Sequence, residues 1–332
     1  MGETNYEIRL FGKEQMQAWN DLFKATFTTG LPENLFQWKY FSNPFGDAIL
    51  AGAFNNDELV AAGALMPELN YLNGRKKLLY KFTDLMVHSS HQKRGLANKI
   101  IAHLTKQATA NGSELLYTLC SKIATKGFVK NNWVYKGAML NYFKPRILLG
   151  LQFAFVRQQK LLAEKTIRII TEPLELQSYF TVQNPSQLFI VAKDYAFLRW
   201  RMSHPRFKYR VLLYEQDERV MGYLLLSHES VSNMYSVIDV DAINDDKKVI
   251  EALLCTAEYL AYKAAARAIL VTAMPDSSMH KAIGNKLYFH NPYSRGPLKS
   301  ELDFNICLLE NDLPYRNQEK LFDISALNYD DV

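Results

Sequence analysis

The sequence predicts an α/β (α+β) protein in which mixed, mostly antiparallel twisted sheets are flanked by helices. Three observations support this fold class. Short apolar runs of strand length alternate along the chain with amphipathic helical stretches. The 332 residues exceed the usual size of one domain, so two domains are expected. A segment that combines a tryptophan, a basic residue and a proline occurs twice, which indicates an internal repeat.

The first half begins with a strand and two helices. Residues 6–11 alternate like a strand, and residues 14–27 carry apolar side chains at helical spacing. Pro32 opens a second helix, which must end before Pro44 because proline disfavours the helical conformation in the preceding residue. Pro67 is expected to end a later strand. Strands are predicted over residues 48–54, 59–65, 69–72 and 77–87, with a hairpin turn at Asn73-Gly74, followed by a helix over 94–110, a strand over 114–120, a helix over 123–131 and a strand over 133–143.

The second half has a similar order after a change of composition at residue 146. We expect a helix or connector over residues 147–162, a strand over 165–170, an irregular stretch over 172–186, a helix over 195–202, strands over 209–214, 220–227 and 234–242, a helix over 247–266, a strand over 268–273, a helix over 277–286, a strand over 302–309 and a polar tail.

The repeat pairs Trp38-Lys39 with Trp200-Arg201. Asn43-Pro44 and His204-Pro205 follow at similar spacing, and three strands, a long helix and a strand come next in both halves. Residues 83–87 then correspond to residues 238–242. The chain is thus interpreted as two copies of one fold, although two unrelated halves that share the pattern by chance remain an alternative.

The turn at residues 92–97, Gln-Lys-Arg-Gly-Leu-Ala, lies between an apolar strand and a helix. A helix N-terminus directs free backbone N–H groups and partial positive charge at one point, where a phosphate or pyrophosphate fits. Gly95 lets the backbone approach an anion, Ala97 leaves the helix start unhindered, and Lys93 and Arg94 add positive charge.

This turn and the order of the elements resemble the GNAT acetyltransferase superfamily, whose signature is Gln/Arg-x-x-Gly-x-Gly/Ala between a strand and a helix. The resemblance implies that Gln92, Lys93, Arg94, Gly95, Leu96 and Ala97 bind the pyrophosphate of acetyl-CoA or another acyl-CoA. It also implies two GNAT-like domains, at residues 1–145 and 165–310, joined by a connector at 146–164 and followed by a tail at 311–332. The second domain lacks the signature, and Asp245-Asp246 would repel a pyrophosphate there.

The resemblance implies that an amine attacks acyl-CoA directly and takes over its acyl group, with acetyl as the first expectation. Such a reaction needs a base for the amine proton and an N–H donor for the thioester oxygen. Asp84, His88 and Glu68 are the candidate bases, with Glu68 interpreted as a solvated loop charge. Val87 and His88 occupy the place of the donor. Phe128 stands where the family often has a proton-donating tyrosine, so Tyr135 or water is the candidate acid.

The expected acceptor is a small-molecule or sugar amine, with a protein lysine as an alternative, and Trp38 and Tyr40 are candidate lining residues of its pocket. A net charge of +5 without a run of five basic residues argues against nucleic acid. Three scattered cysteines fit a reducing cytoplasm, no apolar run is long enough to span a membrane, and Cys120 is expected to be a buried thiol. No metal site is expected, since His88 and His91 lack a third ligand nearby. A homodimer is left open.

Two other functions compete with this one. A non-catalytic CoA-binding or scaffold protein would explain Phe128 and the altered second half. An aminoacyl transferase of the peptidoglycan type also pairs two GNAT-like halves, but it needs a basic surface for tRNA, which the dispersed charge does not indicate.

Overall fold

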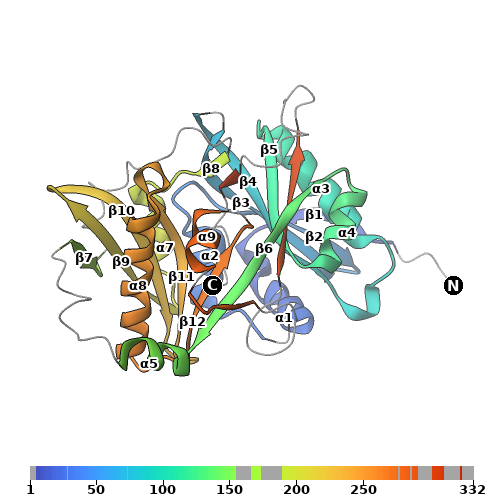
Figure 1. Ribbon diagram of the computed structural model, residues 1–332. Helices are drawn as coiled ribbons and strands as arrows, with labels where there is room; N and C mark the ends of the chain where they lie inside the picture. Colours follow the sequence, from blue (N-terminus) through green and yellow to red (C-terminus); the bar gives the residue numbers. More distant parts are fainter. Residues whose placement is uncertain are drawn as a thin grey trace. The chain divides into compact units, whose positions relative to one another are not determined.

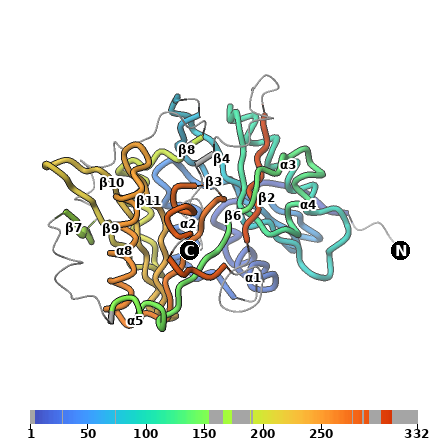
Figure 2. Tube along the Cα trace, in the orientation of Figure 1, coloured from blue at the N-terminus to red at the C-terminus, as the bar shows by residue number. Residues whose placement is uncertain are grey.

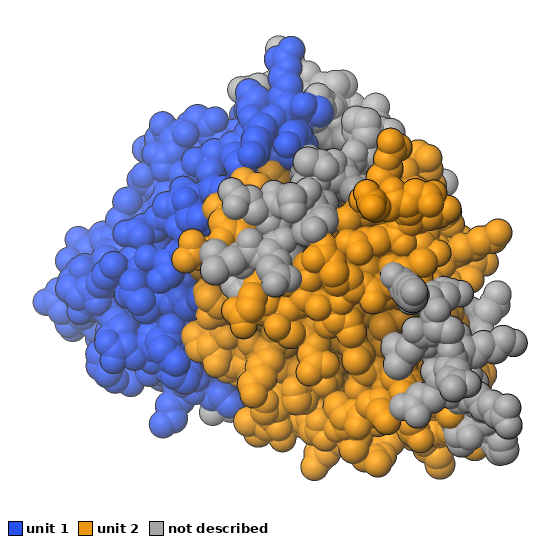
Figure 3. Space-filling model, turned by 90° about the vertical axis from the view of Figure 1, so that its left-hand side faces the viewer, with its two compact units in different colours: residues 1–137, 302–321 blue, residues 138–301, 322–332 orange. Residues whose placement is uncertain are grey.

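The computed structural model describes residues 5–27, 29–72, 74–154, 166–172, 189–275, 277–284, 286–290, 301–309 and 322–323. The chain divides into two compact units, residues 1–137 with 302–321 and residues 138–301 with 322–332 (Figure 3). The polar tail predicted over 311–332, most of the irregular stretch at 172–186 and the later part of the connector lie outside the described residues.

Unit 1 contains strands of one sheet and four α-helices in its described residues, in the predicted order except that the strands expected over 59–65 and 69–72 form one strand. The order is β1 (Glu7–Phe11), η1 (Lys13–Gln15), α1 (Met16–Phe27), α2 (Glu33–Phe41), β2 (Ile49–Asn55), β3 (Glu58–Leu72), β4 (Arg75–Val87), η2 (Ser89–His91), α3 (Leu96–Ala110), β5 (Leu115–Cys120), α4 (Lys122–Lys130) and, from far downstream, β14 (Leu302–Leu308). Strand β6 (Val134–Pro145) begins in unit 1 and continues into unit 2.

The sheet of unit 1 has the order β1-β2-β3-β4-β5-β14. Its neighbours are antiparallel except for β4 and β5, which are parallel, so the expected mixed, mostly antiparallel sheet is confirmed. Helix α3 packs on β2, β3 and β4 (Figure 1). Its Ile100, Ile101 and Leu104 belong to one buried apolar cluster with Phe82 and Leu116. This apolar face of the helix produced the periodicity seen in the sequence.

The prediction that a strand ends near Pro67 was wrong, because β3 runs without a break through it. Pro67 pairs with Tyr80 of β4. Pairing with β2 on the other edge ends earlier, at Leu65 and Ile49. The missing N–H of Pro67 therefore falls where β2 no longer needs a donor, which is the kind of position in which a strand tolerates proline.

Unit 2 repeats the strand order and strand directions of unit 1. Its elements are α5 (Arg146–Ala154), β7 (Ile167–Ile170), β8 (Phe189–Val191), α7 (Tyr195–Met202), β9 (Phe207–Gln216), β10 (Arg219–Glu229), β11 (Met234–Ala242), η4 (Ile243–Asp245), α8 (Lys247–Lys263), β12 (Ala268–Ala273), α9 (Ser278–Ile283), β13 (Phe289–His290) and β15 (Phe322–Asp323). The sheet order is β7-β9-β10-β11-β12-β6, with only β11 and β12 parallel to each other along it. Helix α8 covers β10 and β11, as the predicted amphipathic pattern required.

The last strand of each sheet comes from the other part of the sequence. Residues 302–308 follow α9 in the chain, yet they form β14 beside β5 in unit 1 (orange-red in Figures 1 and 2). Residues 140–145 of β6 follow α4, yet they pair with β12 in unit 2. The domain bounds expected at 145 and 310 follow the sequence repeat, whereas the compact units exchange these two strands.

Candidate active site

The basic turn at residues 92–97 leads directly into α3. Gly95 is the N-cap of the helix with φ 75° and ψ 6°, a left-handed conformation that favours glycine, and no side chain caps the first turn. A Cβ placed on Gly95 would have nothing within 4 Å. Since the first N–H groups of a helix have no partner inside it, the turn presents open backbone donors beside open space.

Arg94 is oriented by hydrogen bonds to its neighbours. Its Nη1 donates to Tyr6 Oη at 2.9 Å, and Tyr6 Oη lies 2.9 Å from His91 Nδ1. Lys93 has a positive φ of 62°, so the backbone reverses twice before α3 begins. The turn is thereby connected to the start of β1, which sequence reasoning did not predict.

Strand β4 diverges from β5 before either strand ends. Their pairing covers Tyr80 to Phe82 against Leu116 to Thr118, although β4 continues to Val87 and β5 to Cys120. The register of β4 against β3 also shifts between Ala62 and Ala64, which marks a β-bulge. We call the diverging ends, residues 83–87 of β4 and 119–120 of β5, the β4–β5 fork.

Val87 directs its backbone polar groups toward β5. The N–H of His88 donates to Val60 of β3 at 2.9 Å. Successive residues of a strand point their N–H groups to opposite edges. The N–H of Val87 therefore points away from β3, toward the open side of the fork, which is where the sequence placed it.

His88 lies immediately after the fork and caps η2. Its Nδ1 lies 2.7 Å from Ser90 Oγ, and its ring is 6.1 Å from that of His91. Within the described part of the chain, Nε2 of His88 has no hydrogen-bond partner. When Nδ1 carries the proton and donates to Ser90 Oγ, Nε2 is the unprotonated nitrogen and can accept a proton.

Asp84 forms the bulge of β4 and is buried under α2. Its φ is 53°, and its Oδ2 accepts hydrogen bonds from Tyr40 Oη at 2.6 Å and Thr83 Oγ1 at 3.1 Å. Lys39 Nζ lies 2.8 Å from the same oxygen, and the two side chains are 1% and 7% exposed. Three donors therefore surround this carboxylate, and sequence reasoning missed Lys39. The signal was present, because α2 is apolar around most of its circumference and a lysine there needs a counter-ion.

The remaining candidate residues lie in different environments. Phe128 is buried between Phe82 and Trp133, with ring centroids 5.1 and 4.7 Å away. Tyr135 is 48% exposed on β6. Trp38 and Tyr40 are both buried, and the Tyr40 hydroxyl is committed to Asp84. The structure brings Tyr40 and Asp84 together.

The interpretation of Glu68 as a solvated loop charge was wrong. Glu68 lies within β3 and is 1% exposed, paired with Lys81 Nζ at 3.0 Å. Tyr117 of β5 also donates to its carboxylate. A carboxylate is stable at this depth because it is ion-paired and hydrogen-bonded. The continuous β3 explains the error, since Pro67 was expected to end the strand.

Strand β14 adds a polar cluster beside the last residue of β5. Asp303 Oδ2 accepts a hydrogen bond from Thr125 Oγ1 of α4 at 2.7 Å, and Asn305 Nδ2 lies 3.4 Å from Cys120 Sγ. Burial raises the pKa of the Cys120 thiol to about 11, so this thiol is neutral near pH 7. The thiol, expected to be buried, is only partly buried, and its partners come from a strand about 180 residues downstream.

Unit 2 has a fork of the same kind but a different turn. Strands β11 and β12 pair only up to Val237 and Val271, and β11 bulges at Ile238. At the start of α8, the Asp246 carboxylate accepts hydrogen bonds from Lys248 N at 2.8 Å and Val249 N at 3.4 Å. An internal carboxylate thus occupies the helix N-terminus that Gly95 leaves open in α3.

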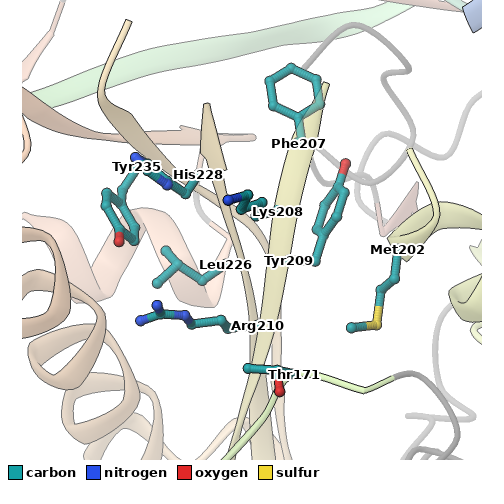
Figure 4. A pocket seen from close by; sticks show the side chains of 9 residues that line it. All are labelled: Thr171, Met202, Phe207, Lys208, Tyr209, Arg210, Leu226, His228 and Tyr235. Atoms are coloured by element: carbon teal, nitrogen blue, oxygen red, sulfur yellow. The ribbon is translucent and has the colours of Figure 1, made fainter. Parts of the chain in front are cut away.

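A cavity of about 350 Å³ lies in unit 2 around the first residues of β9 (Figure 4). Lys208 and Arg210 of β9 lie on the side of Leu226, His228 and Tyr235, while Tyr209, Met202 and Phe207 lie on the other (Figure 4). The His228 and Tyr235 rings stack at 4.5 Å. This basic and aromatic lining favours a small anionic molecule over a cationic one.

Across the described ranges, no group of three or more His, Cys, Asp or Glu side chains is arranged to hold a metal ion. Among the described helices, none combines the length and the apolar character needed to cross a membrane.

Known proteins resemble this chain both in a family model and in fold. Residues 7–126 match the family model of an acetyltransferase (GNAT) domain. No curated protein matches the sequence. A GCN5-related N-acetyltransferase from Anabaena variabilis has a similar fold, with a TM-score of 0.65 and 8% identity over 92% of this chain and 73% of that one. One from Kribbella flavida has a TM-score of 0.63 and 13% identity over 93% and 73%. Saccharomyces cerevisiae N-myristoyltransferase with bound myristoyl-CoA has a TM-score of 0.59 and 12% identity over 92% and 83%. Residues 7–126 therefore match a GNAT acetyltransferase domain, and the chain has the fold of GNAT acyltransferases.

Proposed function

We propose that the chain is an N-acyltransferase that moves an acyl group from acyl-CoA to an amine of a small molecule or a sugar. The observation that carries the proposal is the uncapped N-terminus of α3 at Gly95, which follows directly on the diverging end of β4. The family match of residues 7–126 supports acyl transfer in general. The acyl chain and the acceptor are our proposal.

The turn at residues 92–97 would hold the pyrophosphate of acyl-CoA. The free N–H groups at the start of α3, including those of Leu96 and Ala97, point at one place and carry the positive end of the helix dipole. The open space at Gly95 fits a group that approaches the backbone closely. Gln92, Lys93 and Arg94 would add polar and charged contacts at the rim.

The β4–β5 fork would hold the arm of acyl-CoA and the reacting carbonyl. Bound acyl-CoA supplies an acyl group activated as a thioester. The open edge of β4 offers this arm strand-like hydrogen bonds in place of those that β5 would have made. The Val87 N–H would stabilise negative charge on the carbonyl oxygen as the amine attacks.

His88 is the base that we favour, because its Nε2 is available and it adjoins Val87. As the amine nitrogen bonds to the carbonyl carbon, the amine proton passes to Nε2 and the carbon–sulfur bond breaks. The sulfur then takes a proton from Tyr135 or from water, because Phe128 cannot donate one. Asp84 is less suited to this task, since Lys39 and Tyr40 already bind its carboxylate.

Unit 2 would act as a second copy that does not take the cofactor. Its strand order and its α8 correspond to those of unit 1, which supports a tandem arrangement. The Asp246 carboxylate fills the place where a pyrophosphate would bind. Three free cysteines are consistent with a cytoplasmic protein that meets acyl-CoA in a reducing compartment.

A non-catalytic CoA-binding protein is the second candidate, and Phe128 is the observation that favours it. The ring lies in an apolar setting of Phe82 and Trp133, where it can supply no proton. Thiol release should be measured with acetyl-, butyryl- and myristoyl-CoA against a panel of amines, together with CoA binding by calorimetry. Turnover with an amine supports the enzyme, whereas binding without turnover supports the second candidate. Turnover that requires aminoacyl-tRNA would instead identify an aminoacyl transferase.

The cofactor site is tested by two glycines at opposite ends of α3. Gly95 and Gly112 have φ of 75° and 74°, and a Cβ on either meets nothing within 4 Å. Both Gly95→Glu and Gly112→Glu should lose about 1–2 kcal/mol of stability from left-handed strain. Only Gly95→Glu should also raise the Kd for CoA, by about 100-fold or more, because its carboxylate would meet the pyrophosphate. Equal CoA affinity in the two variants would exclude this turn as the site.

A further inference from the structure

The buried ion pair between Lys39 and Asp84 lies at the base of the β4–β5 fork. We infer that it is a positioning device, which holds the bulge of β4 and so keeps the fork open for the acyl group. The inference rests on the proposed function, and it assigns Asp84 and Lys39 a task other than proton transfer.

The bulge places Asp84 in a conformation that must be held by something. A φ of 53° is a left-handed backbone that a non-glycine residue adopts at a cost. The contacts of the side chain oppose that cost, since Lys39, Tyr40 and Thr83 all reach the same carboxylate oxygen within 3.1 Å. The carboxylate thereby fixes the one residue at which β4 leaves its regular register.

Lys39 connects the bulge to a rigid element. Its side chain is 1% exposed on α2, between the buried side chains of Trp38 and Tyr40. An ammonium group at this depth is stable only with a counter-ion, and Asp84 supplies it at 2.8 Å. The position of α2 therefore determines where the bulge lies. A shift of either α2 or the bulge would leave Lys39 or Asp84 as an unpaired buried charge.

A regular β4 would close the fork. Strand β5 extends two residues beyond its last partner of β4, to Leu119 and Cys120. Without the bulge, Thr83 and Asp84 would come into register with these residues and complete the parallel ladder. The edge of β4 that we assign to acyl-CoA would then be occupied by β5. The ion pair stabilises the open arrangement against this closed one.

Unit 2 shows that the contact serves the backbone rather than the reaction. Lys193 Nζ lies 2.9 Å from Asp239, the two side chains are 6% and 2% exposed, and the Tyr223 hydroxyl also donates to this carboxylate. Asp239 follows the bulged residue Ile238. Acyl-CoA is not expected in unit 2, because Asp246 occupies the N-terminus of α8. Unit 2 nevertheless has the same contact among a lysine, an aspartate and a tyrosine.

The test compares two double variants of the full-length protein. Lys39→Met with Asp84→Asn removes both charges and leaves no unpaired buried ion, and Lys193→Met with Asp239→Asn is the matched control in unit 2. We expect the first to lower kcat by about 100-fold, as a small displacement of a reacting group does. Its KM for acyl-CoA and its Kd for CoA should rise as well, because β5 would occupy the edge of β4 that we assign to the arm of acyl-CoA, although the Gly95 turn is unchanged. The control should change kcat by less than about threefold.

Two further readouts separate positioning from proton transfer. The pH profile of kcat/KM should keep its shape in the first double variant, since Asp84 exchanges no proton in the reaction. Lys39→Arg, which keeps the charge, should retain most of the wild-type kcat. A lost limb of the pH profile, an unchanged kcat, or an equal loss of kcat in the unit 2 control would each overturn the inference.

Hydrogen exchange tests the inference even if the wild-type protein shows no turnover, an outcome that contradicts the proposed function instead. Among Thr83 and Asp84, an amide that faces β5 should exchange faster than that of Phe82, because it lies beyond the β4–β5 pairing. The Lys39→Met, Asp84→Asn variant should slow this exchange by about tenfold as these two residues pair with Leu119 and Cys120, and the unit 2 variant should not. Unchanged exchange in the first variant would overturn the inference.

Discussion

Two of the three cysteine thiols have strongly raised pKa values for the same physical reason. Burial raises the pKa of Cys120 and of Cys307 from the ordinary value of 9.0 to about 11. The unfolded chain therefore loses these thiol protons at a lower pH than the folded chain does. Their contribution to stability is complete below pH 9.0 and is lost as the pH rises toward 11.

This shift predicts a loss of stability in alkali. Between pH 8 and pH 11 the free energy of unfolding should fall by about 2–3 kcal/mol for each of the two thiols. This loss is measured by urea unfolding of the wild-type protein and of a Cys120→Ala, Cys307→Ala double variant at each pH. The difference between the two proteins isolates the thiols, because both proteins contain the same lysines and tyrosines. Parallel pH dependences in the two proteins would show that the thiols are not protected in the folded state.

Single residues also show where sequence reasoning succeeds and where it stops. Gly95 could be predicted, since a glycine before an apolar helical repeat has a local meaning. Glu68 could not be predicted, because its burial depends on Lys81 and Tyr117, which only the sheet brings to it. Asp84 was identified in a central strand, but its lysine partner lay in a different element.

At the scale of elements, the order of helices and strands could be predicted almost completely, whereas the partners of two strands could not. Both β6 and β14 are apolar enough to be strands, and nothing in either segment determines which sheet edge it joins. The choice depends on long-range pairing, such as that of Asp303 with Cys120. The cluster of Thr125, Asp303 and Cys120 was missed for the same reason.

Because β14 completes the sheet of unit 1, we expect that residues 1–145 alone do not form a stable, soluble domain. A fragment of residues 1–145 would leave the edge of β5 unpaired over Leu115 to Cys120 and should aggregate. Residues 1–137 joined by a flexible Gly/Ser linker to residues 301–309 should be soluble and monomeric by size-exclusion chromatography. A fragment of 1–145 that stays monomeric and folded would contradict this role of β14.

Within β14 itself, Ile306 offers a milder test because it is fully buried and pairs with Tyr117. Ile306→Ala should lower the free energy of unfolding by about 2–5 kcal/mol, the usual cost of such a cavity. Chemical unfolding measures the change. Leu10→Ala on the exposed part of β1 serves as the control and should change stability by less than about 0.5 kcal/mol.

For the molecule as a whole, the two helix N-termini predict one acyl-CoA per chain. Gly95 leaves the start of α3 open, while Asp246 occupies that of α8. Calorimetry with CoA should therefore give a stoichiometry of one, and Gly95→Glu should abolish binding rather than halve it. Two binding events, or residual binding of half the sites in Gly95→Glu, would show that unit 2 also takes the cofactor.

The late position of β14 has a consequence for synthesis on the ribosome. Strand β5 is complete at Cys120, but its partner strand begins only at Leu302. At about 5–20 residues per second, the nascent chain carries an unpaired apolar strand edge for about 10–40 s. A lower growth temperature, or a chaperone that covers exposed strand edges, would favour the pairing of β14 with β5. Nascent chains stalled before residue 302 should contain a unit 1 that is still sensitive to protease.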